Sequence, residues 1–211
     1  LDAAPPVPDA HVAAAGFIYV VDDSFNLLTF EPSRRRFARI GTLQCPGTAG
    51  TPFSMGVERN ARAWVLYSDG QLFWVDTGTA ACTRAGIDPR RQGLQRYGMG
   101  FATDGPGAQT EQLYVIGSSS YPGAGTLAAI DPVSLGLTRL GNVPIGAGAM
   151  SPELTGTGAG ELYAFFPGQP SRRGRVVQLR KSDGKVLRTW NLPREGPHGV
   201  TAWAFAHWGG M

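Results

Sequence analysis

Residues 53–85, FSMGVERNARAWVLYSDGQLFWVDTGTAACTRA, contain four short segments with strand character, at 53–58, 63–67, 72–76 and 81–85. A turn follows each of the first three segments. Ser68-Asp69-Gly70-Gln71 is a hairpin turn, because Asp-Gly tolerates the positive φ that tight hairpins require. Four short strands joined by tight turns predict one antiparallel blade of a β-propeller.

The same pattern recurs along the chain. Each repeat has an aromatic residue at the centre of its second strand segment, and the steps between these residues are 45 (64 − 19), 50 (114 − 64) and 49 (163 − 114) residues. The four aromatic residues are Tyr19, Trp64, Tyr114 and Tyr163. An arginine follows each of them by 20 or 25 residues, at Arg39, Arg84, Arg139 and Arg188. A strand-rich repeat of this length is typical of propeller blades.

The two ends of the repeat region are complementary. The first repeat has no strand segment before Phe17, whereas residues 201–208, TAWAFAHW, align with the first strands of the other repeats. We therefore expect an all-β propeller of four-stranded antiparallel blades, closed by pairing of the C-terminal strand with the N-terminal blade. This gives four blades over residues 17–211, preceded by an Ala/Pro-rich linker at residues 1–16. The alternative is five blades, with part of the ring missing from this chain.

Several segments resemble a family of exported bacterial β-propeller repeat proteins, most of which are uncharacterised. The resemblance rests on residues 51–55 (TPFSM), 63–70 (AWVLYSDG), 153–158 (ELTGTG) and 202–205 (AWAF), and it covers most of residues 17–210. It implies a propeller fold and export, and it supplies no catalytic residues. In such relatives a Trp-Gly-Gly step tends to continue into another strand pair, which favours the five-blade alternative.

Charge and hydrophobicity along the chain argue against a nucleic-acid partner and against a transmembrane segment. The net charge is only +3, and short arginine clusters fall in predicted turns without interleaved aromatic residues, so we expect no nucleic-acid interface. No apolar run reaches the roughly 18 residues that span a bilayer, so no transmembrane segment is predicted in this chain. The N-terminal linker is compatible with a lipid anchor or an export signal upstream.

The chain has two cysteines, Cys45 and Cys82, placed after the last strand of the first repeat and within the last strand of the second. Neighbouring repeats are neighbours in space, so a disulfide between them is geometrically feasible. Such a bond would indicate an extracytoplasmic location, in the periplasm, at the cell surface or secreted. The alternative is two buried free thiols.

Polar residues on and just after the first strands are the candidate ligand-binding residues, because first strands line a propeller channel and loops at its mouth commonly bind ligands. The candidates are Glu58, Asp104, Glu153, Thr155, Thr157 and His207. Glu153 stands where the other repeats have Ser54, Gly98 and Ala202, so it could bind a cation, a sugar hydroxyl or a basic group. It could equally hold neighbouring backbone N–H groups and stabilise the ring.

No motif of a nucleophile elbow, a zinc site or a phosphate-binding loop is present, so we predict no catalytic residue, cofactor or metal. The sequence favours a non-enzymatic extracytoplasmic module that contacts a protein or glycan partner through its loops and channel mouth. The alternative is a propeller hydrolase or lyase that acts on a sugar or lactone, with Glu153 near the channel.

Overall fold

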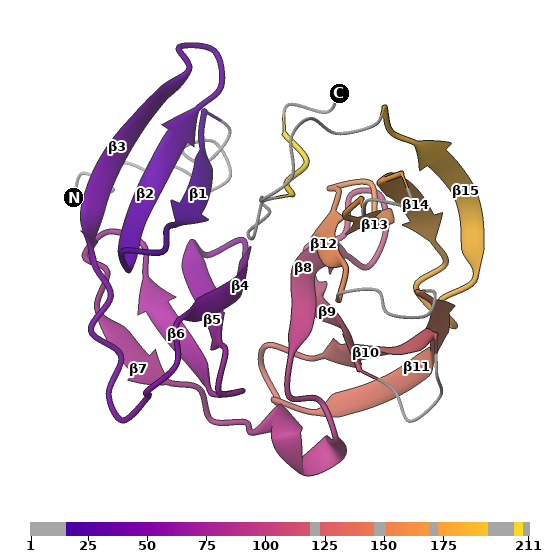
Figure 1. Ribbon diagram of the computed structural model, residues 1–211, viewed down its shortest axis with the longest axis horizontal. Helices are drawn as coiled ribbons and strands as arrows, with labels where there is room; N and C mark the ends of the chain where they lie inside the picture. The colour runs from indigo at the N-terminus through magenta and orange to yellow at the C-terminus, as the bar shows by residue number, and fades with distance from the viewer. Residues whose placement is uncertain (1–15, 119–122, 146–150, 169–172, 194–204, 209–211) are drawn as a thin grey trace, which may run out of the picture.

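The computed structural model describes residues 16–118, 123–145, 151–168, 173–193 and 205–208. Its strands form four antiparallel sheets, and within each sheet the strands follow their order in the sequence. The sheets are arranged in a ring, each presenting one edge toward the centre (Figure 1). The chain is therefore a four-bladed β-propeller, as the repeat predicted.

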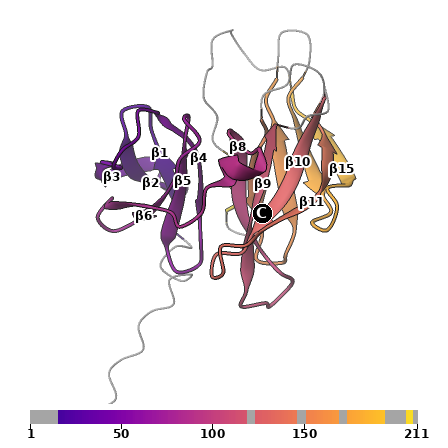
Figure 2. The same ribbon diagram turned by 90° about the horizontal axis from the view of Figure 1, so that it is seen from below.

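The first blade contains β1 (Ile18–Val21), β2 (Asn26–Glu31) and β3 (Arg36–Thr42), and the second contains β4 (Pro52–Val57), β5 (Arg62–Tyr67), β6 (Leu72–Asp76) and β7 (Cys82–Arg84). The third contains β8 (Tyr97–Thr103), β9 (Glu111–Ser118), β10 (Ala124–Ile130) and β11 (Leu137–Pro144). The fourth contains β12 (Glu153–Gly156), β13 (Leu162–Phe166), β14 (Arg175–Leu179) and β15 (Val186–Asn191). A short 3₁₀ helix, Pro89–Gln92, lies in the connection between the second and third blades (Figure 2).

The hairpins form where the sequence indicates them. Gly70 of the Asp69-Gly70 turn and Gly184 of the Asp183-Gly184 turn have φ angles of 82° and 76°. These values lie in the left-handed region that glycine adopts without a steric cost. The turn residues therefore fix where β5 ends and β6 begins, and likewise for β14 and β15.

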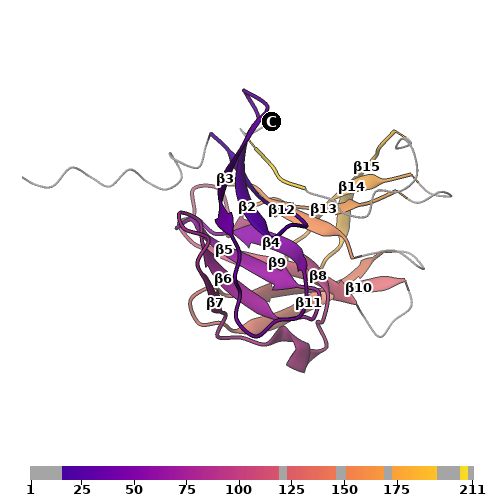
Figure 3. The ribbon, with the colours of Figure 1, turned by 60° about the vertical axis from the view of Figure 1, so that its left-hand side comes forward.

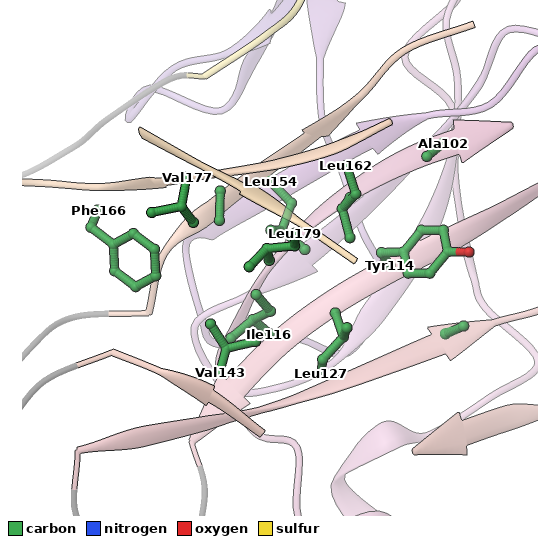
Figure 4. Close-up of a cluster of buried hydrophobic side chains, with 12 residues drawn as sticks. Ala102, Tyr114, Ile116, Leu127, Val143, Leu154, Leu162, Phe166, Val177 and Leu179 are labelled. Atoms are coloured by element: carbon green, nitrogen blue, oxygen red, sulfur yellow. The ribbon is translucent and has the colours of Figure 1, made fainter. Parts of the chain in front are cut away.

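The core lies between adjacent blades. Trp64 is fully buried in a cluster with Met99 and Leu113 of the third blade. Figure 4 shows the matching cluster of the next pair, in which Leu154 and Val177 of the fourth blade face Ile116 of the third. Two of the second-strand aromatic residues, Trp64 and Tyr114, therefore pack in the core. Tyr114 is 6% exposed.

The innermost strands β4, β8 and β12 run in the same direction and pack side by side (Figures 1 and 3). The approach of β8 to β12 is close enough to require glycine. A Cβ added at Gly98 would lie 1.8 Å from the carbonyl oxygen of Pro152, and one at Gly156 would lie 2.2 Å from the carbonyl oxygen of Phe101. Real Cβ atoms essentially never come so near.

The described residues of the C-terminal segment, 205–208, lie between the first and fourth blades. The backbone N–H of His207 donates to Thr155 Oγ1 on β12 at 2.9 Å, and the rings of Phe205 and Phe165 are 5.7 Å apart. Residues 201–204 of the expected closing strand lie outside the described residues, as do residues 1–15 of the expected linker. The described part of this segment, Phe205–Trp208, forms no strand, and the first sheet has three strands in the described chain.

Cys45 and Cys82 form a disulfide, with their Cα atoms 4.9 Å apart. Cys45 lies in the connection from β3 to β4, and Cys82 begins β7, the outermost strand of the second blade. The bond therefore ties the crossover from the first blade to the outer edge of the second. It closes a loop between residues separated by 37 positions.

Candidate functional site

Two cavities lie along the central channel. The larger, of about 270 Å³, is lined by the carboxyl-terminal parts of β4, β8 and β12 and the residues that follow β4 and β12. The smaller, of about 100 Å³, is lined by the amino-terminal part of β4 and the first residue of β12. Tyr19 and Met55 line both cavities. Since the inner strands run in the same direction, the two cavities lie toward opposite ends of the channel.

Apolar side chains form most of the wall of the larger cavity. They come from all four blades and from the C-terminal segment, and include Phe17, Met55, Val57, Phe101, Leu154 and Ala206. Four glycines also line it, at Gly56, Gly100, Gly156 and Gly158. This cavity is thus an apolar recess with polar residues at the ends of the strands.

Glu58 lines the larger cavity, and its carboxylate is engaged within its own blade. The residue is 7% exposed. Its Oε1 accepts hydrogen bonds from the Arg62 guanidinium and from Trp64 Nε1, the latter at 2.9 Å. The Arg62 guanidinium also lies 4.5 Å from the centre of the Trp74 ring. The Glu58 carboxylate therefore holds the side chains of Arg62 and Trp64 in place through these hydrogen bonds.

Arg59 and Glu111 form a second polar pair beside the larger cavity. The backbone N–H of Arg59 donates to Glu111 Oε1 at 2.6 Å, and Arg59 Nη1 donates to the carbonyl oxygen of Ala108 at 2.7 Å. Burial raises the pKa of Glu111 above its ordinary value, and Arg59 offsets part of that rise. Glu111 was absent from the sequence-based candidates, because a single glutamate at the start of a second strand carries no recognisable pattern.

Thr155 and Thr157 also line the larger cavity, and their hydroxyls serve local hydrogen bonds. Thr155 Oγ1 accepts from the backbone N–H of His207 at 2.9 Å, and Thr157 Oγ1 accepts from that of Glu161 at 3.2 Å. Thr103 Oγ1 donates to the Thr157 carbonyl oxygen at 3.2 Å. These bonds hold the end of β12 against β8 and against the C-terminal segment.

The structure brings three of the six candidates together and separates the rest. Glu58, Thr155 and Thr157 line the larger cavity, and Glu153 lines the smaller one. Asp104 is exposed and is not a lining residue of either cavity, although its carbonyl oxygen accepts from Lys181 Nζ at 3.1 Å. His207 is partly buried and contacts Thr155 through its backbone.

Glu153 is the candidate residue with a strongly shifted pKa. Ser54 Oγ donates to Glu153 Oε2 at 2.8 Å and accepts from the backbone N–H of Met99 at 3.1 Å. Burial raises the pKa of Glu153 to about 7, and the hydrogen bond from Ser54 offsets part of that rise. Burial disfavours the charged form of a carboxyl group, and this accounts for the direction of the shift.

No cluster of three or more histidine, cysteine, aspartate or glutamate side chains suited to a metal ion occurs in the part of the chain that the structure describes. Within that same part, no helix has the length and apolar character needed to cross a membrane.

No protein-family model matches the sequence, and no curated protein matches it. Solved structures do match. The Dos1 propeller is 16% identical, with a TM-score of 0.51 over 83% of this chain and 44% of that chain. A protein of unknown function from Bacteroides thetaiotaomicron is 13% identical, with a TM-score of 0.48 over 71% of this chain and 41% of that one.

Kuenenia stuttgartiensis hydrazine synthase is 13% identical, with a TM-score of 0.46 over 84% of this chain and 46% of that chain. The chain thus spans less than half the length of these solved chains. At these identities the likeness to the Dos1 propeller supports the propeller fold alone.

Proposed function

We propose that this propeller is an extracytoplasmic binding module that takes an uncharged, apolar group of a protein partner into the larger cavity. The observation that carries the proposal is the apolar recess of about 270 Å³ at the carboxyl-terminal ends of β4, β8 and β12. Its volume is near the lower end of those typical of small-ligand pockets, about 300 Å³. Covering apolar wall area contributes roughly 25 cal/mol per Å².

The charges beside this cavity favour an uncharged ligand. Glu58 is paired with Arg62, and Glu111 accepts from the Arg59 backbone. A ligand with a net charge would have to compete with these internal partners and lose its own hydration. An apolar side chain of a protein partner avoids both of these free-energy costs. Its burial against residues such as Phe101 and Leu154 contributes favourable binding free energy.

The same hydrogen bonds argue against a glycan at this cavity. Sugar hydroxyls need free donors and acceptors, but the side chains of Glu58, Thr155 and Thr157 already serve partners within the protein. A protein partner is therefore the better fit, and a glycan is the competing outcome in the test below.

Gly158→Trp tests the site. Gly158 lines the larger cavity, its φ is not in the left-handed region, and no heavy atom lies within 4 Å of the position that a Cβ would take. The new ring should fill the recess without disturbing the fold. We expect N-acetyl-phenylalanine amide to shift the NMR signals of Phe101 and Leu154 in the wild-type protein, and Gly158→Trp to abolish these shifts.

Gly105→Trp is the matched control. Gly105 has the same open surroundings and is not a lining residue of either cavity, so this variant should respond like the wild-type protein. If a methyl glycoside rather than the apolar amide shifts these signals, the glycan alternative is correct. Equal responses from both tryptophan variants would show that the amide binds elsewhere.

We propose further that the module has no turnover. One observation favours the alternative of a hydrolase or lyase: the pKa of Glu153, about 7, suits a general acid at neutral pH. However, glycoside hydrolysis uses two carboxyl groups, and Glu153 is the one carboxylate among the described residues that line the smaller cavity. Hydrolysis of a glycoside or lactone panel by the wild-type protein, lost in a stably folded Glu153→Gln variant, would establish the enzyme instead.

The disulfide supports the extracytoplasmic part of the proposal. Disulfides persist in oxidising compartments and are rare in reducing ones. Cys45 and Cys82 are bonded in the structure, which is consistent with export. Thiol alkylation of the protein as isolated from its native cells, followed by intact mass, should show no free thiol, and two alkylated cysteines would place the protein in a reducing compartment.

A further inference from the structure

The smaller cavity combines aromatic rings with one charged side chain. Three of its lining residues are aromatic, namely Tyr19 on β1, Phe53 on β4 and Phe205 of the C-terminal segment. Glu153 is the charged residue among those that line it, and the remaining walls are mostly aliphatic. The cavity lies toward the end of the channel opposite the proposed protein-binding recess, so nothing in its chemistry depends on that proposal.

The Glu153 carboxyl group is only partly satisfied. Its Oε2 accepts from the Ser54 hydroxyl at 2.8 Å, and no further donor to this carboxyl group lies among the described residues. A buried carboxylate with a single neutral donor is costly unless a positive charge accompanies it. The cavity beside Glu153 is therefore a place where a cation gains both a counter-charge and enclosure.

The neighbouring charged and titratable groups do not supply that cation. The Arg96 guanidinium lies 6.0 Å from the centre of the Phe53 ring, and it is an exposed residue whose Nε donates to the Ser68 carbonyl oxygen. Neither Arg96 nor His207 is a lining residue of the cavity. Ser54 and Met99, which complete the contact from β4 and β8, are uncharged.

We propose that the smaller cavity binds an alkylammonium group, with Glu153 as its counter-ion and Tyr19, Phe53 and Phe205 as its walls. Aromatic rings attract cations through their negative faces, and rings around a quaternary ammonium are an established way to bind one. The volume of about 100 Å³ is several times the roughly 10–15 Å³ that a cavity needs to hold one water molecule. The cavity therefore has room for several non-hydrogen atoms of such a head group.

A metal ion fits this cavity less well. Calcium takes about six to eight oxygen ligands, whereas the polar side chains here are Glu153, Ser54 and the phenol of Tyr19. An organic cation needs no such shell, because methyl groups pack against the apolar walls. The head group could belong to a lysine side chain, to the N-terminus of a protein, or to a small molecule of the choline type.

Choline and 3,3-dimethylbutan-1-ol test the charge requirement, because the alcohol replaces the ammonium nitrogen of choline by carbon at nearly the same shape. By titration calorimetry we expect choline to bind the wild-type protein at least about tenfold more tightly than the alcohol, because only the cation is attracted to the ring faces and to the Glu153 carboxylate. In Glu153→Gln, which keeps an acceptor for Ser54, this preference should shrink through weaker choline binding, and the part that the rings contribute should remain.

Glu161→Gln is the matched control. Glu161 is a partly buried carboxylate of the same blade that accepts from the Tyr163 hydroxyl and from Gln178 Nε2, and it is not a lining residue of the smaller cavity. This variant should bind choline with wild-type affinity. Three further compounds distinguish the source of the cation by their relative affinities. Nα-acetyl-lysine methylamide and its Nε-trimethylated form represent a side-chain ligand, and glycine methylamide represents a protein N-terminus.

Phe53→Leu keeps the proposal testable if Glu153→Gln fails to fold. Removing the ring while keeping an apolar wall should weaken choline at least about threefold and change the alcohol little, because only the cation uses the ring face. The proposal is overturned if choline and its neutral analogue bind equally, if neither binds at millimolar concentration, or if folded Glu153→Gln and Phe53→Leu both retain wild-type affinity for choline.

Discussion

The hydroxyl of Ser54 donates to Oε2 of Glu153 at 2.8 Å, although 99 positions separate the two residues in the chain. The same hydroxyl accepts the backbone N–H of Met99 at 3.1 Å. These two bonds join the inner strands of the second, third and fourth blades. Glu153 is thus a structural tie of the ring and also the charged wall of the smaller cavity.

The first prediction concerns the pH dependence of stability at Glu153. Its pKa is about 7 in the folded protein against an ordinary value of 4.5, so the folded state holds a proton that the unfolded state releases. The resulting stability is fully present below pH 4.5 and is lost as the pH rises through 7. From about pH 5 to about pH 8 we expect the wild-type protein to lose about 2–3 kcal/mol more unfolding free energy than Glu153→Gln.

Urea denaturation of the two proteins at both pH values measures this difference. Glu111, whose pKa is also raised by burial, titrates in both proteins, so its contribution cancels in the comparison. Parallel pH profiles for the wild-type protein and Glu153→Gln would mean that the Glu153 carboxyl titrates as an ordinary exposed group.

The second prediction concerns the contact of β8 with β12. A Cβ at Gly98 would lie 1.8 Å from the Pro152 carbonyl oxygen, so Gly98→Ala must separate the two inner strands. We expect a loss of about 3 kcal/mol in unfolding free energy, measured by urea denaturation. Gly105→Ala, where a Cβ meets open space, serves as the control and should change stability by less than about 1 kcal/mol. Equal effects of the two substitutions would contradict the close packing.

The third prediction concerns the disulfide. Replacing Cys45 and Cys82 by serine releases a loop between residues 37 positions apart, and the chain-entropy model then gives a loss of about 3–4 kcal/mol. The melting temperature of the double variant should fall accordingly. A reducing agent should lower the melting temperature of the wild-type protein and leave that of the variant unchanged. A reductant effect of equal size on both proteins would point to a cause other than this bond.

The fourth prediction compares two ion pairs of similar spacing. Glu58 is buried with Arg62 and Trp64, whereas the pair of Glu31 with Arg34 is 3.5 Å apart and exposed on the arginine side. We expect Glu58→Gln to cost about 2 kcal/mol, because the partly buried Arg62 loses its counter-ion. Glu31→Gln should cost less than about 1 kcal/mol. Chemical denaturation of both variants tests this, and similar losses would show that Glu58 is no more enclosed than Glu31.

Much of the fold could be predicted from local patterns. Each predicted segment of the three complete blades corresponds to a strand, since alternating strand residues and Asp-Gly turns act over only a few positions. The hydrogen-bond partners of Glu58 are also local in the sequence, because Arg62 and Trp64 follow it by four and six positions.

The site could be predicted only in part. The sequence singled out Glu153 because its counterparts in the other repeats are small, but it did not identify Ser54 as its partner or Glu111 as the partner of Arg59. Residues 52 and 99 positions apart meet only once the blades pack, and no spacing along the chain encodes such contacts. Thr155 and Thr157 line the larger cavity, while Asp104 lines neither cavity.

By itself, the sequence determined the repeat, the strands, the turns and the propeller architecture, because each follows from local residue preferences repeated at a regular spacing. Only the tertiary structure decided which polar groups are engaged, where the two cavities lie and why Gly98 must be glycine. Those features depend on how closely the inner strands approach one another. The approach is set by the packing of whole blades, and the tie from Ser54 to Glu153 is its clearest consequence.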